Sequence, residues 1–431
     1  MNLDNIKKVH FIGIGGIGVS AIARMFLGRG VEVSGSDAEE SKITKKLESM
    51  GAKIFYGHKA ENLAGDVDLV VYTVAIDQDN PEFVKAKELG IETKTYSQML
   101  GIISSGYYTV AVSGTHGKTT TTAMLAKVAV DGELDPTVIV GSLLKDSGSN
   151  LIAGNSDLFI VEACEYKRSF LDLKPNILVI TNIEEDHLDY YKDLTDIQNA
   201  FKELVNKLGE DDFVVCNPND EKVKLVIADA KCKVIDYTDL RGRATSTLEL
   251  KVVGEYNQQN AKAAFAVAEI LKIEKQKAFK ALSEFEGVWR RFEYKGKTEN
   301  EIEIYDDYAH HPTEIRAILK AAKDRFPDQK IITVFQPHLY SRTKLLLNDI
   351  AESFSDTDKV LVTPIYAARE DNDININNEI LADEINKNTS NAEAFKDFDQ
   401  IKQYLKDNTQ KDDIILTMGA GDVYKIGESI L

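Results

Sequence analysis

The sequence has few cysteines and no long hydrophobic run, and both absences narrow the classes of protein to consider. Only Cys164, Cys216 and Cys232 occur among 431 residues, without the CxxC spacing of a zinc site or the even number of a disulfide framework. We therefore expect three buried, reduced thiols. No segment approaches the roughly 20 apolar residues of a membrane-spanning helix, and the N-terminus lacks the apolar region of a secretory signal. We expect a cytoplasmic protein.

Positive charge is also scarce. The chain has 52 Lys and Arg residues against 70 Asp and Glu residues, a formal net charge of -18 that is spread along its length. No basic face is expected that could follow a nucleic acid or an anionic membrane, so neither is predicted as a partner. Any phosphate group that the protein binds must be held locally, by a few residues.

Short β-branched runs alternate with helical patterns along most of the chain, which predicts the α/β class with parallel sheets covered on both faces. The clearest runs are residues 9–12, 69–72, 109–112, 158–161 and 177–180. A chain of this length exceeds a single hydrophobic core. We predict three domains: residues 1–104, residues 105–292 and residues 293–431.

The start of one helix in the last domain can be predicted. Pro312 has the fixed backbone angle that suits a first helical position, and apolar residues follow it at helical spacing. We therefore expect a helix from Pro312, with His310 and His311 just before its first turn. The polar residues 295–300 are expected to lead into a strand at residues 302–305.

A first glycine-rich loop, GIGGIG at residues 13–18, follows a predicted strand and opens a predicted helix. Such a loop lets backbone amides and a helix N-terminus approach a diphosphate. A later strand ends at Asp37, which could bind a ribose hydroxyl. NAD fits this pattern, and a diphosphate sugar nucleotide fits it equally well.

A second glycine-rich loop, SGTHGKT at residues 113–119, has the features of a P-loop. Val112 stands where the full pattern has its first glycine, but Gly117, Lys118 and Thr119 supply the amides, the cation and the hydroxyl for phosphates and magnesium. A helix over residues 120–128 is predicted to follow. This loop is the most specific single motif in the chain.

Carboxylates that could complete a magnesium site follow the next two strands. Glu162 ends one strand, where parallel sheets place their ligand sites, and Glu165 lies close behind it. The following strand runs into TNIEEDH at residues 181–187. Beside a P-loop, His187 is expected to be a functional residue and a ligand of a second magnesium ion.

These residues resemble the Mur ligase family over essentially the whole chain. The resemblance rests on the two glycine loops, with Ser20 after the first, and on further motifs along the sequence. The further motifs are EACE at 162–165, NIEEDHLD at 182–189, Asn257 and Asn260, RRFE at 290–293, DDYAHHP at 306–312, QPH at 336–338, SRT at 341–343 and MGAGD at 418–422.

The resemblance implies a ligase in peptidoglycan precursor synthesis that uses ATP and Mg²⁺. It implies UDP-N-acetylmuramic acid and L-alanine as the substrates, joined through an acyl phosphate. The N-terminal Rossmann-like domain would bind the UDP sugar and the central P-loop domain would bind ATP. The C-terminal Rossmann-like domain would close over ATP and the amino acid.

The motifs and the resemblance together define the predicted site. The expected ATP-binding residues are Gly114, Thr115, His116, Gly117, Lys118, Thr119, Thr120, Asn257, Asn260 and Arg291. The expected substrate-binding residues are Gly13, Gly15, Gly16, Gly18, Ser20, Asp37, Tyr308 and His338. The expected metal ligands are Thr119, Glu162 and His187. The expected catalytic residues are Lys118, His187, Asp307, His310, His338 and Arg342.

Some alternatives remain open at this point. An NAD-binding oxidoreductase would use only the first glycine loop, and a P-loop switch or motor ATPase would use only the second. Within the family, a ligase that recycles murein peptides onto the same sugar nucleotide is conceivable, as is a folylpolyglutamate synthase type, which the opening loop followed by Ser20 disfavours. The general base that deprotonates the amine is either His310 or His338, and capping of the following helix is the alternative role for His310 and His311.

Overall fold

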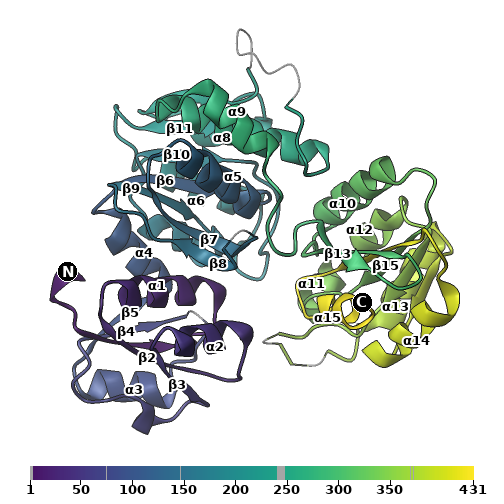
Figure 1. Cartoon of the computed structure of the whole chain (residues 1–431), viewed down its shortest axis with the longest axis horizontal. Helices are drawn as coiled ribbons and strands as arrows, with labels where there is room; N and C mark the ends of the chain where they lie inside the picture. Colours follow the sequence, from purple (N-terminus) through teal and green to yellow (C-terminus); the bar gives the residue numbers. More distant parts are fainter. Residues whose placement is uncertain (1–2, 74, 146, 240–247, 369, 372) are drawn as a thin grey trace. The chain divides into compact units, whose positions relative to one another are not determined.

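The computed structural model describes residues 3–73, 75–145, 147–239, 248–368, 370–371 and 373–431. It confirms the α/β class, with three sheets whose strands are mostly parallel (Figure 1). The chain forms two compact units. The first comprises Met1–Leu248 and Gln259–Glu284, and the second comprises Glu249–Gln258 and Phe285–Leu431. Among the described residues, no helix combines the length and apolar character needed to cross a bilayer.

The first sheet is fully parallel, with the strand order β3-β2-β1-β4-β5. Its strands are β1 (Lys8–Ile12), β2 (Glu32–Asp37), β3 (Lys53–Tyr56), β4 (Leu69–Tyr72) and β5 (Glu92–Thr95). Its helices are α1 (Ile17–Gly28), α2 (Lys42–Ser49), α3 (Pro81–Glu88) and α4 (Tyr96–Ser104), with short 3-10 helices η1 (Leu3–Asn5) and η2 (Ala60–Asn62). Helices α1 and α3 cover opposite faces (Figure 1). The strand order reverses between β1 and β4, so the loop after β1 lies where such sheets bind ligands.

The second sheet has the order β12-β11-β10-β6-β9-β7-β8 and is parallel except for β8, which pairs antiparallel with β7. Its strands are β6 (Tyr108–Ser113), β7 (Thr137–Leu144), β8 (Ser149–Ile152), β9 (Leu158–Glu162), β10 (Ile177–Ile180), β11 (Phe213–Cys216) and β12 (Lys233–Asp236). Its helices are α5 (Lys118–Asp131), η3 (Tyr166–Asp172), α6 (Leu194–Val205), α7 (Glu221–Ile227), α8 (Glu255–Ile270) and α9 (Lys275–Ser283). Strand β6 is flanked by β9 and β10, so the loops after these three strands meet at one edge of the sheet.

The first two sheets share one hydrophobic core within the first unit. Met99 and Ile103 of α4 belong to the same buried cluster as Phe159 of β9 and Phe170 of η3. The backbones approach closely here, because a Cβ built on Gly101 would lie 2.4 Å from the carbonyl oxygen of Asp172. A close approach of this kind admits only glycine.

The third sheet lies in the second unit and has the order β13-β14-β18-β15-β16-β17. Its strands are β13 (Glu293–Lys297), β14 (Glu303–Asp307), β15 (Ile331–Phe335), β16 (Lys359–Val362), β17 (Ala392–Ala394) and β18 (Ile414–Met418). Its helices are α10 (Pro312–Arg325), α11 (Tyr340–Leu345), α12 (Leu347–Ala351), η4 (Glu352–Phe354), α13 (Asn378–Asn388), α14 (Phe398–Asn408) and α15 (Tyr424–Ser429). The part of the polar stretch up to Lys297 is a strand, since β13 pairs antiparallel with β14.

Helix α10 begins at Pro312, as the sequence predicts. The imidazole of His311 accepts a hydrogen bond from the amide of Thr313, and Glu314 completes the capping box from the third helical position. The apolar residues that follow at helical spacing are buried in the core of this unit. The capping contacts and the burial of the apolar residues therefore both support a helix that begins at Pro312.

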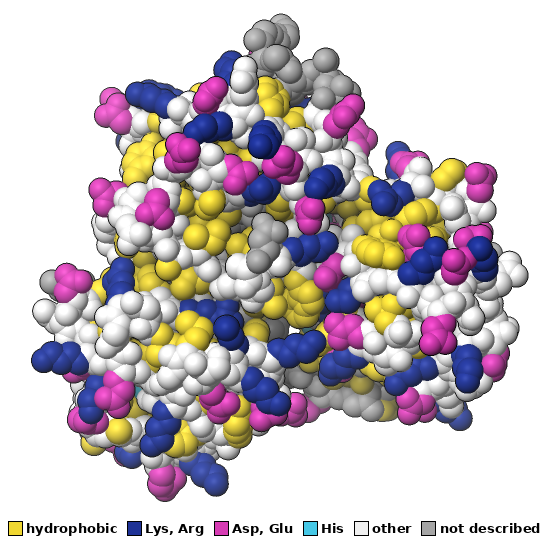
Figure 2. All heavy atoms as spheres, in the orientation of Figure 1, with side chains coloured by type: hydrophobic (Ala, Val, Ile, Leu, Met, Phe, Trp, Pro, Cys, Tyr) yellow, Lys and Arg dark blue, Asp and Glu magenta, His cyan; other side chains and the backbone are white. Residues whose placement is uncertain are grey.

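Two details concern the thiols and the surface. Cys216 and Cys232 are buried, but Cys164 is exposed, so the prediction of three buried thiols is wrong for that residue. It follows β9 and directly precedes Glu165, which is buried. On the face shown in Figure 2, acidic side chains are interspersed with lysine and arginine over both units.

Candidate active site

The P-loop connects β6 to α5, and its backbone conformation requires glycine at two positions. Gly114 has a φ of +133° and Gly117 a φ of +82°. A Cβ built on Gly114 would lie 2.0 Å from Oγ1 of Thr181, and one built on Gly117 would lie 2.5 Å from Oδ1 of Asn260. Any side chain would strain the backbone and collide with a neighbour. The amides of this loop and of the first turn of α5 are thereby gathered at a helix N-terminus, which favours phosphate.

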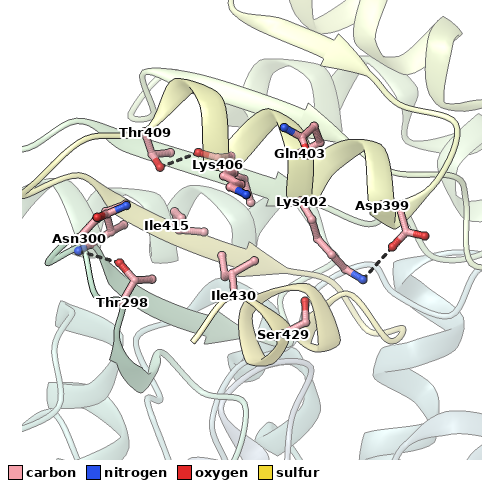
Figure 3. A pocket seen from close by; sticks show the side chains of 12 residues that line it. Thr298, Asn300, Asp399, Lys402, Gln403, Lys406, Thr409, Ile415, Ser429 and Ile430 are labelled. Atoms are coloured by element: carbon pink, nitrogen blue, oxygen red, sulfur yellow. Dashed lines mark hydrogen bonds and ion pairs between the residues drawn. The ribbon is translucent and has the colours of Figure 1, made fainter.

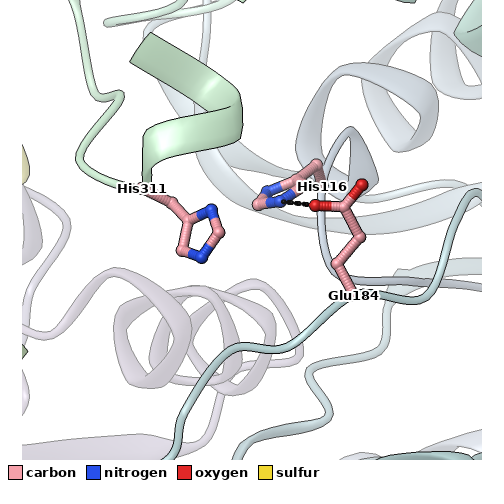
Figure 4. A group of neighbouring side chains, drawn as sticks. All are labelled: His116, Glu184 and His311. Carbon is pink, nitrogen blue, oxygen red and sulfur yellow. Dashed lines mark ion pairs between the residues drawn. The ribbon is translucent and has the colours of Figure 1, made fainter. Parts of the chain in front are cut away.

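The segment after β10 holds the P-loop in place. Asn182 accepts the amide of Thr115 with its backbone oxygen at 3.0 Å, and it accepts the amide of His116 with Oδ1 at 2.9 Å. Oγ1 of Thr181 donates to the carbonyl of His116 at 2.6 Å. The amide of Glu184 donates to Oγ1 of Thr115, and the Glu184 carboxylate lies 3.4 Å from Nε2 of His116 (Figure 4). The loop is therefore ordered by protein contacts alone.

Lys118 is a largely buried cation in this site, with its side chain 13% exposed. Its ammonium donates to the carbonyls of Gly114 and Thr115 at 2.6 and 2.9 Å, and to Oε1 of Glu165 at 2.9 Å. Burial lowers the pKa of Lys118, but the charge and hydrogen bond of Glu165, together with the other acidic groups nearby, raise it more, so the pKa lies above its ordinary value. Lys118 is thus a fixed positive charge at neutral pH.

Thr119 and Glu162 form a pair of oxygen ligands next to Lys118. The hydroxyl of Thr119 donates to Oε1 of Glu162 at 3.0 Å, and Oε2 of Glu162 accepts the amide of Gly141 at 2.7 Å. A hydroxyl and a carboxylate held this way are the hard oxygen ligands that Mg²⁺ prefers. Two of the three predicted metal ligands are therefore neighbours.

The third predicted ligand, His187, lies in a second group with Glu165 and Asp186. Each offers one ligand atom, and these atoms lie within 4.8 Å of one another. Nε2 of His187 is 3.6 Å from Oε1 of Glu165 and 3.8 Å from Oδ2 of Asp186. Oε2 of Glu165 is buried without a hydrogen-bond partner among the described residues, which suits a cation. Glu165 and Asp186 are not among the predicted metal ligands. Both lie in the sequence motifs at residues 162–165 and 182–189 that carry the family resemblance.

The charge state of Glu165 follows from these contacts. Burial by itself raises the pKa of Glu165, but the charge of Lys118 and the hydrogen bond and charge of His187 lower it more, so the pKa falls below its ordinary value. The carboxylate is therefore ionised at neutral pH and is paired with a cation.

The other predicted ATP-binding residues differ in their surroundings. Thr120 is buried in the first turn of α5, and Asn260 of α8 approaches the loop at Gly117. Asn257, in the second unit, is buried, and its side-chain amide donates to the carbonyl of Val253 at 2.7 Å.

The first glycine loop joins β1 to α1 in the first unit. Gly13 has a φ of +79°, and the amide of Gly15 donates to Oδ2 of Asp37 at 2.8 Å. A Cβ on Gly18 would lie 2.6 Å from the ring of Tyr96. A Cβ on Gly16 would have more room, 3.3 Å from the nearest atom. Asp37, which is predicted to bind substrate, therefore accepts a hydrogen bond from the glycine loop itself.

Ser20 is fully buried one turn into α1. Its hydroxyl donates to the carbonyl of Ile17 at 2.9 Å and accepts from Nδ2 of Asn150 at 3.3 Å. Arg24 of the same helix donates to Ser149 and Asn150 at 2.9 and 2.8 Å. Strand β8 of the central sheet is thus hydrogen-bonded to the helix that follows the first glycine loop.

In the second unit, Asp307 ends β14 and is almost fully buried. Its Oδ2 accepts the amide of Phe292 and its Oδ1 accepts the amide of Ala309, each at 2.7 Å. Burial raises the pKa of Asp307 to about 7, against the charge of Arg291 and these two hydrogen bonds, which lower it. Both carboxylate oxygens therefore hold backbone segments.

The predicted residues that follow β14 and β15 come together within the second unit. Tyr308, His310 and His338 form a row of rings, with centroids 5.6 Å apart at each step, and the ring of Tyr366 stacks on His338 at 5.8 Å. Nη1 of Arg342 lies 3.2 Å from Nδ1 of His338. The guanidinium of Arg291, another predicted residue of this unit, lies 5.4 Å from the ring of Tyr308.

Arg290 is a buried residue to which the predicted site assigned no role. Its guanidinium donates to Asp306 at 2.8 Å and to the carbonyls of Gly421 and Gly419 at 2.7 and 2.6 Å. The linker before β13 and the glycine loop after β18 are thereby tied together. The charge in the motif at residues 290–293 is visible in the sequence, but two of its partners, the carbonyls of Gly419 and Gly421, are more than 100 residues away.

A cavity of about 390 Å³ lies elsewhere in the second unit, beside α14 (Figure 3). Its lining includes Ile302 and Ile415, which lie at the amino ends of β14 and β18, together with Lys402 and Lys406. Ligand sites of parallel sheets lie at the carboxyl ends of the strands. None of the predicted site residues lines this cavity.

A P-loop with a buried lysine, beside two groups of acidic metal-ligand candidates in a mostly parallel sheet, defines a nucleotide-binding α/β protein. Comparison with known families identifies the family to which this protein belongs. Residues 8–108 match the Mur ligase family catalytic domain, residues 112–244 the Mur ligase middle domain, and residues 290–421 the Mur ligase glutamate ligase domain. The chain belongs to the Mur ligase family.

Individual relatives match over nearly their full length. The chain is 45% identical to the UDP-N-acetylmuramate–L-alanine ligase of Clostridium novyi, covering 99% of this chain and 98% of the relative, and 45% identical to that of Acetivibrio thermocellus, covering 99% and 96%. The crystal structure of UDP-N-acetylmuramate-alanine ligase from Thermotoga maritima superposes with a TM-score of 0.83, at 30% identity and 98% coverage of both chains. A murein peptide ligase from Psychrobacter arcticus shares the fold, with a TM-score of 0.73 at 23% identity and 98% coverage of both chains.

Proposed function

We propose that this protein joins L-alanine to the carboxylate of UDP-N-acetylmuramic acid, at the expense of ATP, in peptidoglycan precursor synthesis. The observation that carries the proposal is the match over the whole length, at 45% identity, to ligases named for these substrates. Because ATP is the phosphoryl donor, we place the reaction in the cytoplasm.

The chemistry needs activation because a carboxylate is a poor acyl donor. Transfer of the γ-phosphoryl group of ATP onto the carboxylate gives an acyl phosphate, and attack by the amine then releases phosphate. Protein catalysis of phosphoryl transfer consists mostly of positioning and charge neutralisation. Lys118 can neutralise charge in this way, because its ammonium is largely buried, charged and held beside the P-loop by three hydrogen bonds.

Magnesium fits the residues beside the P-loop. Thr119 and Glu162 would hold one ion, and His187 with Glu165 and Asp186 would hold a second. Bound there, Mg²⁺ would neutralise charge on the phosphates. The unpartnered buried oxygen of Glu165 supports the second assignment.

The two glycine loops have separate tasks in this proposal. The loop at residues 13–18, in the domain of residues 1–104, binds the diphosphate of the sugar nucleotide, and Asp37 orders that loop through Gly15. The P-loop domain, residues 105–292, binds ATP. The C-terminal domain, residues 293–431, binds the amino acid, with Tyr308, His338 and Arg342 at the carboxyl ends of its strands.

The buried position of Asp307 supports a positioning role rather than contact with substrate. Its two oxygens fix the linker residue Phe292 and the loop residue Ala309. Arg291 and Asn257 remain proposed ATP contacts, and Ser20 is proposed to support the first glycine loop from its buried position.

Phosphate release tests the proposal. The purified chain is incubated with ATP, Mg²⁺ and UDP-N-acetylmuramic acid, and with L-alanine, glycine, L-serine or the murein tripeptide in separate reactions. We expect release with L-alanine that requires the sugar nucleotide. Release with the tripeptide but not with alanine would reassign the amine substrate to peptide recycling. Release without any sugar nucleotide would indicate a switch or motor ATPase.

A further inference from the structure

The amine of alanine enters the reaction as an ammonium ion, so the proposed function requires a group that removes a proton before attack. Imidazole is the side chain best suited to this task near neutral pH. A neutral imidazole has one N–H and one basic lone pair, and only the nitrogen with the lone pair can accept the proton. The hydrogen-bond partner of Nδ1 shows whether that nitrogen carries the hydrogen. It therefore shows whether the basic lone pair is on Nδ1 or on Nε2.

His310 has its lone pair on the outer nitrogen. Its Nδ1 lies 3.0 Å from the carbonyl oxygen of Tyr308. A carbonyl can only accept, so Nδ1 carries the hydrogen and the basic lone pair is on Nε2. The ring of His310 is flanked by the rings of Tyr308 and His338, at the carboxyl end of β14 where ligand sites of such sheets lie.

The two other histidines of this region have the opposite arrangement. Nδ1 of His338 lies 3.2 Å from Nη1 of Arg342, and arginine can only donate. Nδ1 of His311 accepts the amide of Thr313 at the start of α10. In both rings the Nδ1 lone pair is engaged, so the neutral form carries its hydrogen on Nε2.

A carboxylate supports His310 in this role. Oε2 of Glu314 lies 3.6 Å from Nδ1 of His310 and also accepts the amide of His310 at 3.2 Å. Its negative charge would stabilise the imidazolium that forms when Nε2 takes a proton, as an orienting acid does for a catalytic histidine. Asp307 is almost fully buried, and each of its oxygens holds a backbone amide, which suits a positioning role.

We propose that Nε2 of His310 is the general base that deprotonates the ammonium of the incoming amino acid, with the carbonyl of Tyr308 and the carboxylate of Glu314 orienting the ring. The free amine attacks the carbonyl carbon of the acyl phosphate, a C–N bond forms, and the C–O bond to phosphate breaks. The first proton is on His310, and the second proton lost by the nitrogen leaves with the phosphate. This inference rests on the proposed function.

The test separates proton removal from acyl phosphate formation. His310→Asn keeps a side-chain N–H donor for Tyr308 but has no base. With ATP, Mg²⁺ and UDP-N-acetylmuramic acid, we expect alanine-dependent phosphate release to fall about 100-fold or more. Hydroxylamine is largely unprotonated at neutral pH and needs no base, so hydroxamate formation by His310→Asn should stay close to the wild-type rate. His310→Gln should behave in the same way.

His311→Asn is the matched control, because asparagine retains the cap of α10. We expect it to keep both activities. If hydroxamate formation falls with the alanine rate in both His310 variants, or if His311→Asn loses the alanine rate to the same extent, His310 is not the base. A His310→Asn enzyme with a wild-type alanine rate would also refute the assignment. Failure of the wild-type protein to release phosphate with alanine would instead refute the proposed function.

Discussion

The ion pair between Lys118 and Glu165 allows a quantitative test of how the P-loop is held. Glu165→Gln keeps the shape of the side chain and removes its charge, which leaves the ammonium of Lys118 buried without a carboxylate. Breaking a buried pair by removing one partner typically costs about 3–5 kcal/mol. Glutamine still offers an acceptor, and Lys118 keeps its bonds to Gly114 and Thr115. We therefore expect the free energy of unfolding to fall by about 2–3 kcal/mol.

The pH dependence has a definite sign. Burial alone would raise the pKa of Glu165, but Lys118 and His187 hold it below its ordinary value in the folded protein. A carboxylate with a lowered pKa stabilises the fold fully above the pKa of the unfolded state, and the stabilisation is lost as the pH falls through the folded value. The difference between wild type and Glu165→Gln should therefore be constant around neutral pH and shrink as the solution is acidified.

The assay is urea unfolding followed by far-UV circular dichroism, at pH 7 and at decreasing pH. The single tryptophan, Trp289, lies in the second unit and packs on Tyr424, so its fluorescence reports on a unit that the substitution does not touch. We expect the midpoint of the dichroism transition to fall with an unchanged slope. Equal midpoints at pH 7, or a difference that grows on acidification, would refute the reasoning.

Three further substitutions test other parts of the site. Lys118→Ala should lower kcat about 100- to 1000-fold in the phosphate-release assay, because a fixed charge on the transferring group is lost; a rate near wild type would remove Lys118 from the mechanism. Gly117→Ala places a Cβ 2.5 Å from Oδ1 of Asn260, at a φ of +82° that favours glycine. ATP binding measured by calorimetry should therefore weaken at least about tenfold. An unchanged affinity would contradict this contact. Asn150→Ala removes an acceptor from buried Arg24 and should destabilise the first unit by about 1–3 kcal/mol in urea, whereas no change would mean that the contact is not maintained in solution.

Much of the fold could be predicted from the sequence, because its signals are local. The strands that contain residues 109–112 and 158–161 are mostly apolar runs, and the glycines, Lys118 and Thr119 of the P-loop lie in one short segment. In a parallel sheet, residues that follow neighbouring strands must meet at one edge. This rule is sufficient to bring Glu162 beside Thr119.

The pairing of the remaining charged residues could not be predicted in the same way. Whether Glu162 or Glu165 bonds Lys118 depends on how the backbone turns after β9, and in the structure Glu165 makes this bond. Ser20 is predicted to bind substrate, and the motif does not reveal its contact with Asn150, 130 residues away. The choice between two candidate histidines required the hydrogen bond of each Nδ1, which no spacing reveals.

The electrostatics of the P-loop explain how a chain of net charge -18 can bind a nucleoside triphosphate. Lys118 is already neutralised by Glu165, so the positive potential at the loop comes largely from backbone amides and the N-terminus of α5. On the proposed function, phosphate oxygens take over bonds of Lys118 and free Glu165, which then adds its full charge to the group with Asp186 and His187. That group attracts a divalent cation more strongly once ATP is bound. Nucleotide and metal therefore favour each other's binding, as linkage requires.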